Sequence, residues 1–197
     1  MFPDQISREE LNELPLRHYT GKVVVTARAQ QFAEIIQEVK AEKVIGFDTE
    51  TRPSFRKGEY YPVSLVQLAI PNKVFLLRIH QTGMTQEIKA MLSDPDLIKV
   101  GVGTLDDIKA LQKMDPYFKP DGFVDLNDIA KELEVKNAGL RKLTAIFLGF
   151  RISKSQQVSN WERPELTERQ VRYAATDAWA CLEIYNQLQQ WGYIDEA

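Results

Sequence analysis

The sequence predicts an α/β fold, built as a mixed β-sheet that is flanked by helices on both faces. Short runs of Val, Ile and Leu have the length of buried strands, and amphipathic patterns of helical period alternate with the later runs. The dipeptide Pro71-Asn72 marks a hairpin turn between two of these runs. No internal repeat or linker divides the chain, so we expect a single domain over residues 1–197. Its core spans about residues 22–193, after a short N-terminal extension, residues 1–21.

The expected elements begin in the N-terminal extension. Ser7-Arg8-Glu9-Glu10 is a capping-box pattern that opens a short helix. Residues 22–26 are expected to form an edge strand, and the apolar stripe over residues 29–39 predicts an amphipathic helix. Three strands, a helix and a further strand follow, at residues 44–49, 63–70, 73–77, 86–92 and 98–102. Three antiparallel strands followed by alternating helices and strands favour an RNase H-like sheet.

The rest of the chain is expected to be essentially helical. Gly101 and Gly103 permit a tight turn, after which Thr104 is expected to cap a helix that runs through Leu111. Thr167 is expected to cap a long helix, whose apolar stripe runs over residues 171–188.

Two carboxylates stand together at the end of the strand at residues 44–49. Side chains alternate along a strand, so Asp48 and Glu50 share one face while Thr49 takes the other. Such a pair stays in water or is neutralised by a proton or a cation, and oxygen ligands favour Mg²⁺ or Mn²⁺. A solvated strand end is the alternative interpretation.

Two further clusters carry acidic groups on helices. Asp106 and Asp107 fall in the first turn of the helix after residue 103, where the helix dipole also favours acids, and only one of them can point at a given centre. Tyr173 and Asp177 are spaced i, i+4, so they lie on one side of the last helix. Small residues around Asp177 would let another element approach closely.

With these motifs in order, the sequence resembles the 3′-to-5′ exonucleases of the DEDD superfamily, in the branch that contains a tyrosine. FDTE, GVGTLDD and YAATD match the three motifs of that branch, with Asp107 in the ligand position of the second. SNWERPELTERQVRYAATDA extends the match in the manner of the Werner-like subgroup, and the catalytic domain of RNase D is also similar. The resemblance covers about residues 23–193.

The resemblance implies a metal-dependent exonuclease that releases nucleoside 5′-monophosphates from a 3′ end with two divalent cations, Mg²⁺ or Mn²⁺. Asp48 is expected to bridge both cations, Glu50 and Asp177 to complete the shell of one, and Asp107 to hold the second. Tyr173 is expected to hydrogen-bond and orient the attacking water, because a free tyrosine has a pKa of about 10.

The expected partner is a nucleic acid with a free 3′ end, although the net charge is −3. Residues 136–163 hold six basic residues against one acid, and this stretch is a candidate phosphate track. Trp161 is expected either to stack on a base or, as most lone tryptophans do, to pack under its loop. The candidate substrate contacts are Thr49, Lys154, Asn160, Trp161 and Arg163.

Three functional classes stay open at this point. A DNA exonuclease is favoured by the Werner-like features, while an RNA-trimming enzyme of RNase D type would be expected to carry further C-terminal helical domains. A catalytically silent nucleic-acid-binding module is least favoured, because all four acids and the tyrosine are present. Cys181 is the only cysteine and is expected in the core, and no zinc site is expected. Without an apolar stretch of 18 residues or a signal pattern, we expect a cytoplasmic enzyme and no membrane partner.

Overall fold

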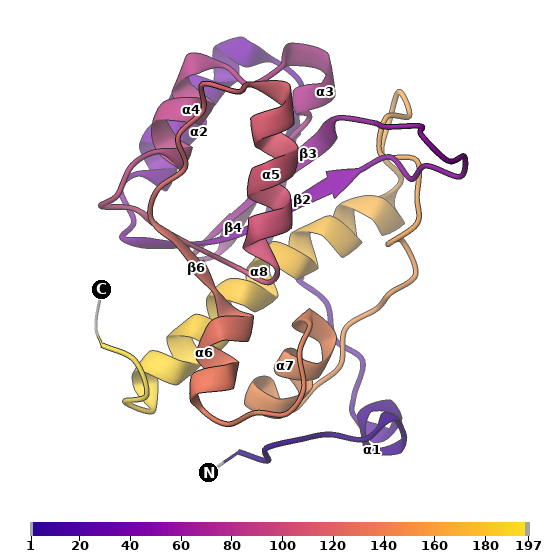
Figure 1. Ribbon diagram of the computed structural model, residues 1–197, viewed down its shortest axis with the longest axis vertical. Coiled ribbons are helices and arrows are strands. Elements are labelled where there is room, and N and C mark those ends of the chain that lie inside the picture. The colour runs from indigo at the N-terminus through magenta and orange to yellow at the C-terminus, as the bar shows by residue number, and fades with distance from the viewer. Residues whose placement is uncertain (1, 196–197) are drawn as a thin grey trace.

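The computed structural model describes residues 2–195 and confirms the predicted α/β fold, with a mixed sheet between two layers of helices (Figure 1). The strand order is β1-β4-β3-β2-β5-β6. Strand β3 pairs antiparallel with β2 and with β4, whereas β1, β5 and β6 join the sheet in parallel. The strands are β1 Lys22–Thr26, β2 Val44–Thr51, β3 Val63–Ile70, β4 Lys73–Leu77, β5 Ile98–Gly101 and β6 Phe123–Asp125.

The helices divide between the two faces of the sheet. On one face, α2, α4 and α5 bury apolar side chains against β2, β3 and β4. On the other face lies α8, which crosses the sheet diagonally in Figure 1 and packs on α6 and α7 at one end. The helices are α1 Arg8–Glu13, α2 Ala29–Val39, α3 Ile79–Thr82, α4 Gln86–Leu92, α5 Thr104–Met114, α6 Leu126–Glu132, α7 Leu140–Leu148 and α8 Glu168–Gln190.

Most predicted elements are confirmed. The capping box at Ser7 and the edge position of β1 are present, and residues 71–72 form a two-residue turn between β3 and β4. Thr167 caps α8 through a hydrogen bond from the backbone N–H of Gln170, 3.2 Å long. Cys181 is buried in the core, and within residues 2–195 no helix is both long and apolar enough to cross a bilayer.

Two expectations were wrong. The chain after β5 is not entirely helical, because residues 123–125 add β6 to the edge of the sheet. Thr104 does not cap α5 but is its first residue, and Gly103 stands at the cap position with a positive φ of 72°. The carboxylate of Asp125, at the end of β6, accepts the N–H groups of Gly103 and Thr104 at 3.1 and 2.9 Å. A distant side chain therefore satisfies donors that a local cap would otherwise take.

The tight approach of α8 to β2 depends on Gly46. A Cβ at this position would lie 1.9 Å from the backbone carbonyl oxygen of Ala178, so any side chain forces the helix and the strand apart. Alanines at 174, 175 and 178 pack with Leu65 and Ala69 of β3 in the layer beneath α8. Asp48 lies two residues after Gly46, on the same face of β2, and Asp177 lies one residue before Ala178 on α8. The contact of Gly46 with Ala178 therefore brings the two aspartates together.

We predict that Gly46→Ala lowers the free energy of unfolding by about 1–3 kcal/mol, since overpacking against backbone cannot be relieved by a rotamer change. Hydrolysis should also fall, because α8 carries Asp177 away from β2. Gly192→Ala is the control. The φ of Gly192 is 74°, which disfavours alanine, but a Cβ there meets nothing within 4 Å, so this variant should lose stability and keep its activity. Chemical denaturation and an exonuclease assay on both variants provide the measurements, and full activity of Gly46→Ala would contradict the role of this contact.

Candidate active site

Three of the predicted acids converge at the carboxyl end of β2. Each of Asp48, Glu50 and Asp177 places a carboxylate oxygen within 4.8 Å of the other two. Asp48 and Glu50 share a face of β2, as alternation predicted, and α8 brings Asp177 onto that face. The donor set consists of oxygens alone, which suits a hard divalent cation such as Mg²⁺ or Mn²⁺.

Asp107 joins this cluster through Thr49. The hydroxyl of Thr49 donates to Asp107 Oδ1, and the backbone N–H of Thr49 donates to Asp48 Oδ1 at 2.9 Å. Thr49 thus holds the two aspartates beside each other from the opposite face of β2. Asp106 is exposed to solvent, whereas Asp107 is half-buried and lies outside the group of three acids that are mutually within 4.8 Å.

Burial and mutual repulsion make ionisation of these acids costly. Burial, and then the charges of Asp177 and Asp107, raise the pKa of Asp48 well above its ordinary value. Burial is also the main cause of the raised pKa values of Glu50, about 10, Asp177, about 8, and Asp107, about 6. In the absence of a cation, the folded protein therefore keeps protons on this cluster at neutral pH.

Tyr173 stands one turn before Asp177 on α8. Burial, followed by the charges of Asp177, Glu50 and Asp48, raises the pKa of the Tyr173 hydroxyl above its ordinary value of 10. The hydroxyl is therefore protonated at neutral pH and serves as a hydrogen-bond donor. The ring lies beside Trp161, with the two centroids 6.0 Å apart.

The predicted substrate contacts have different environments. Trp161 is fully buried against α8, so the packing alternative is confirmed and its ring is not free to stack on a base. The carbonyl of Asn160 accepts from Gln170, 3.1 Å away, and the Asn160 side chain accepts from the N–H of Glu162 at 3.1 Å. Lys154 is exposed at the rim of a depression beside Tyr173 and Asp177.

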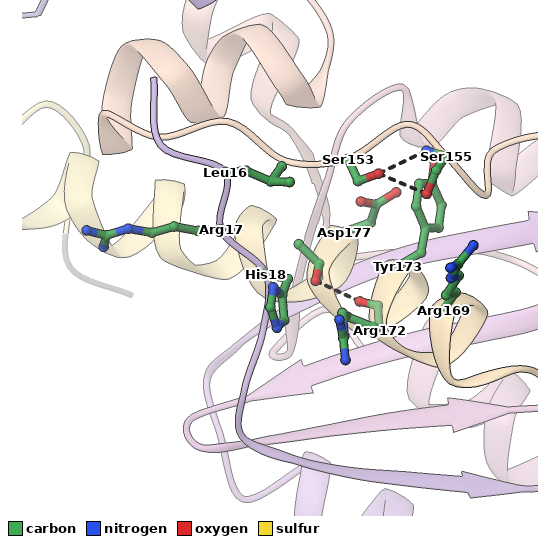
Figure 2. A pocket seen from close by; sticks show the side chains of 10 residues that line it. Leu16, Arg17, His18, Ser153, Ser155, Arg169, Arg172, Tyr173 and Asp177 are labelled. Atoms are coloured by element: carbon green, nitrogen blue, oxygen red, sulfur yellow. Dashed lines mark hydrogen bonds between the residues drawn. The ribbon is translucent and has the colours of Figure 1, made fainter. Parts of the chain in front are cut away.

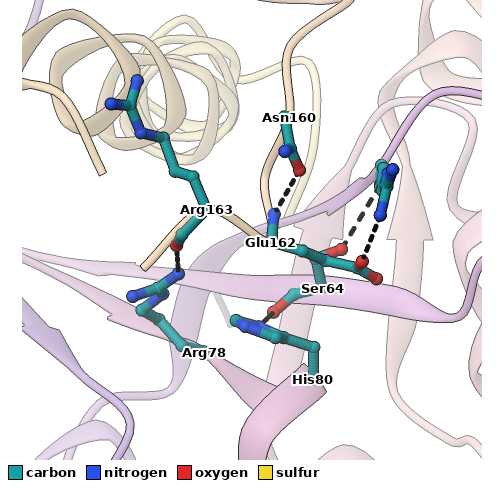
Figure 3. Close-up of polar contacts among 7 residues, drawn as sticks. Ser64, Arg78, His80, Asn160, Glu162 and Arg163 are labelled. Atoms are coloured by element: carbon teal, nitrogen blue, oxygen red, sulfur yellow. Dashed lines mark hydrogen bonds and ion pairs between the residues drawn. The ribbon is translucent and has the colours of Figure 1, made fainter. Parts of the chain in front are cut away.

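Arg78, which the sequence did not single out, fixes the segment that precedes α8. Its buried guanidinium donates to the backbone carbonyls of Arg163 and Pro164, the latter at 2.6 Å. Figure 3 shows the contact of Arg78 with Arg163, and also the contact of His80 with the carbonyl of Ser64. Glu162 forms an ion pair with Arg52, 3.3 Å long. Arg78 follows β4 and lies far from residues 160–166 in sequence, so no local pattern could reveal its role.

Two depressions open beside Tyr173 and Asp177. One, of about 250 Å³, lies between α8 and the N-terminal extension and is drawn in Figure 2; its basic lining residues are Arg17, His18, Arg169 and Arg172. The other, of about 310 Å³, is lined by Arg141, Lys142 and Lys154. Ser153, like Tyr173 and Asp177, lines both. Basic groups thus line both depressions beside Asp177, where they would favour an anionic ligand.

The fold and the acidic cluster define a hydrolase that acts on nucleic acid. A family described as 3′-5′ exonuclease matches residues 23–191, and the chain belongs to this family. It is 32% identical to the mouse bifunctional 3′-5′ exonuclease/ATP-dependent helicase WRN over 92% of this chain and 14% of that protein. It is 30% identical to a 3′-5′ exonuclease of Arabidopsis thaliana, over 95% of this chain and 70% of that protein.

Solved structures agree with the fold. The Nibbler EXO domain of Aedes aegypti superposes with a TM-score of 0.77 at 26% identity, covering 89% of this chain and 93% of that one. RNase D of Escherichia coli, an exoribonuclease involved in structured RNA processing, superposes with a TM-score of 0.74 at 22% identity. That likeness covers 88% of this chain and 47% of RNase D, and it confirms the RNase H-like arrangement.

The raised pKa values predict how the stability of the cation-free protein depends on pH. Free Asp and Glu have pKa values of 3.8 and 4.5, so above about pH 4 the unfolded chain releases protons that folded Asp107, Asp177 and Glu50 retain. The free energy of unfolding in EDTA should therefore fall as pH rises, by about 1.4 kcal/mol per pH unit for each retained proton.

Urea denaturation from about pH 5 to pH 9 measures this trend. Asp177→Asn should make the decline shallower, because Asn cannot ionise. Stability that rises over this range in EDTA would show that the acids are already ionised in the folded protein.

Proposed function

We propose that this chain removes nucleotides from the 3′ end of DNA with the help of two divalent cations, Mg²⁺ or Mn²⁺. The observation that carries the proposal is the convergence of Asp48, Glu50 and Asp177 within 4.8 Å, from two elements that are far apart in sequence. One buried and two partly buried carboxylates in one place destabilise the protein unless protons or cations neutralise them. The proposal assigns this activity to one domain over residues 1–197, with its core at about 22–193.

The residues present fit such cations. Asp48 is the proposed shared ligand because it lies between the other acids, with Glu50 and Asp177 on one side and Asp107, through Thr49, on the other. Glu50 and Asp177 would complete one site, and Asp107 would serve the second. When bound, the cations supply an activated water and neutralise charge on the phosphate.

Tyr173 orients rather than deprotonates the attacking water in this proposal. The raised pKa of its hydroxyl keeps the proton in place, so the hydroxyl donates a hydrogen bond and does not act as a base. The buried ring of Trp161 packs beside the ring of Tyr173 and restricts its position. Arg78 and Gln170 hold the segment that carries Trp161.

The basic groups around the two depressions are the proposed contacts to the phosphate backbone. Lys154, together with Arg141 and Lys142, is placed on one side of the acids, and Arg17 and Arg169 are placed on the other. In this proposal Thr49 positions Asp48 and Asp107 through its two hydrogen bonds. The segment that contains Asn160, Trp161 and Arg163 is held by Arg78 and Gln170 and supports Tyr173. A cytoplasmic location stays a prediction of the sequence.

DNA is favoured over RNA by the Werner-like segment SNWERPELTERQVRYAATDA and by the somewhat higher sequence identity to the mouse WRN protein, 32%, than to ribonuclease D of Haemophilus influenzae, 28%. RNA is the second candidate, because the E. coli structure with the same fold is that of an exoribonuclease. The 2′-hydroxyl distinguishes the two substrates chemically.

A digestion assay tests the proposal. Matched DNA and RNA oligonucleotides, labelled at the 5′ or the 3′ end, are incubated with Mg²⁺ or Mn²⁺. We expect 5′-labelled DNA to shorten one nucleotide at a time, 3′-labelled DNA to release a mononucleotide at once, and RNA to react at least about tenfold more slowly. Faster digestion of RNA would favour the RNase D-type activity, and no digestion with either cation would indicate a silent binding module.

Neighbouring aspartates provide a matched pair of variants. Asp107→Asn should lower the rate by at least about a hundredfold, because it removes a cation ligand, whereas Asp106→Asn should remain within about twofold of the parent. Both replacements remove one carboxylate from the first turn of α5, so they change the interaction with the helix dipole alike. Single-turnover kinetics on a labelled oligonucleotide measures the difference, and equal rates would mean that Asp107 is not a ligand.

A further inference from the structure

Gln67 in β3 is an amide buried without a hydrogen bond. Its side chain is 0% exposed, and neither Oε1 nor Nε2 has a partner among the residues that the structure describes. An unsatisfied buried polar group costs about 1–3 kcal/mol, and a leucine or methionine would fill the same space without this cost. Native proteins rarely keep a buried polar group without a hydrogen bond. We therefore expect the amide of Gln67 to bind a partner that becomes available when a cation is present.

The neighbours of Gln67 in the sheet are apolar, with one exception. Leu76 lies opposite it on β4, and Leu65 and Ala69 flank it on the same face of β3. Alanines of α8 cover this layer. On the remaining side, the residue directly opposite Gln67 on β2 is Asp48. Side chains of directly paired residues in an antiparallel sheet share a face, with Cβ atoms about 4.5–5.5 Å apart. The amide is thus within reach of the carboxylate.

The chemistry of an amide suits this position. An amide is neutral, so it adds no charge to a crowded acidic cluster, and its NH₂ group donates to an ionised carboxylate. One oxygen of Asp48 already accepts the N–H of Thr49, 2.9 Å away. A second donor on the β3 side would fix the rotation of the carboxylate, which one hydrogen bond leaves free.

We propose that Gln67 is a positioning residue for Asp48: its amide donates to the Asp48 carboxylate when that group is ionised and holds a cation, and so fixes the orientation of the carboxylate. This inference rests on the proposed cation site. Groups that orient a metal ligand from behind typically change metal affinity or activity by 10- to 100-fold when removed, roughly the effect expected of Gln67.

Gln67→Met tests the proposal, with Leu68→Met as the matched control. Leu68 is the next residue on β3, equally buried, but faces the opposite side of the sheet. Isothermal titration with Mg²⁺ should give a Kd about 10- to 100-fold higher for Gln67→Met and unchanged for Leu68→Met. In EDTA, Gln67→Met should be at least as stable as the parent, because two unsatisfied polar atoms are gone. A Kd for Gln67→Met equal to that of the parent would overturn the proposal.

A measurement on the unaltered protein covers the case in which the variant does not fold. In ¹⁵N-labelled protein, the side-chain NH₂ signals of Gln67 should shift downfield when Mg²⁺ is added, as expected for a new bond to a carboxylate. Mg²⁺ binding that leaves these signals in place would overturn the role of Gln67. If the parent shows no Mg²⁺ binding by titration or by shifts of backbone signals around Glu50 and Asp177, then the cation site itself is wrong.

Discussion

The close contact of α8 with β2 is the constraint on which the rest of the site depends. Gly46 lets the carbonyl of Ala178 approach the strand to a distance that no side chain would permit. Ala174, Ala175 and Ala178, on both sides of Asp177, pack in the layer between α8 and the sheet. As a result, the carboxylate of Asp177 lies within 4.8 Å of the carboxylates of Asp48 and Glu50. Packing of small residues therefore assembles a group of charges that, by themselves, repel one another.

The free energy of ionising these neighbouring carboxyls is unfavourable, and a bound cation would lower it. In the folded chain the carboxyls hold protons because burial and like charge disfavour ionisation. A divalent cation bound by these carboxylates would displace the protons and offset the repulsion between them, so cation binding, proton release and stability would be linked. The same burial keeps Tyr173 protonated, which suits it to orient water beside the cluster. The backbone N–H of Thr49 donates to Asp48, and Gln67 lies directly opposite Asp48 on β3.

How much of this the sequence could predict depends on the range of the interactions. Strands β3 and β4 and the helix over residues 86–92 have the predicted bounds, because alternation, turn residues and helical period are local signals. Strand β6 has three residues and forms only by pairing with β5, so its own sequence carries too little pattern. The cap at Asp125 and the clamp at Arg78 join residues far apart in the chain.

The candidate site shows the same division. Alternation placed Asp48 and Glu50 on one face, and helical period placed Tyr173 beside Asp177. That these two pairs meet followed only from the resemblance, since the meeting depends on the Gly46–Ala178 contact. The hydrogen bond from Thr49 to Asp107 joins β2 to α5 on the other face of the sheet, so it has no local signal in the sequence. The burial of Trp161 likewise depends on the distant Arg78, which holds its segment.

Counting the protons released on cation binding tests the central claim most directly. Isothermal titration of the protein with Mg²⁺ at pH 7, in buffers that differ in ionisation enthalpy, gives this number. Because Asp177 and Glu50 have raised pKa values of about 8 and 10 and the pKa of Asp48 is also raised, we predict that at least about one proton is released per protein molecule. Binding of Mg²⁺ without proton release would show that the acids are ionised before the cation arrives, and would contradict the proposed exchange.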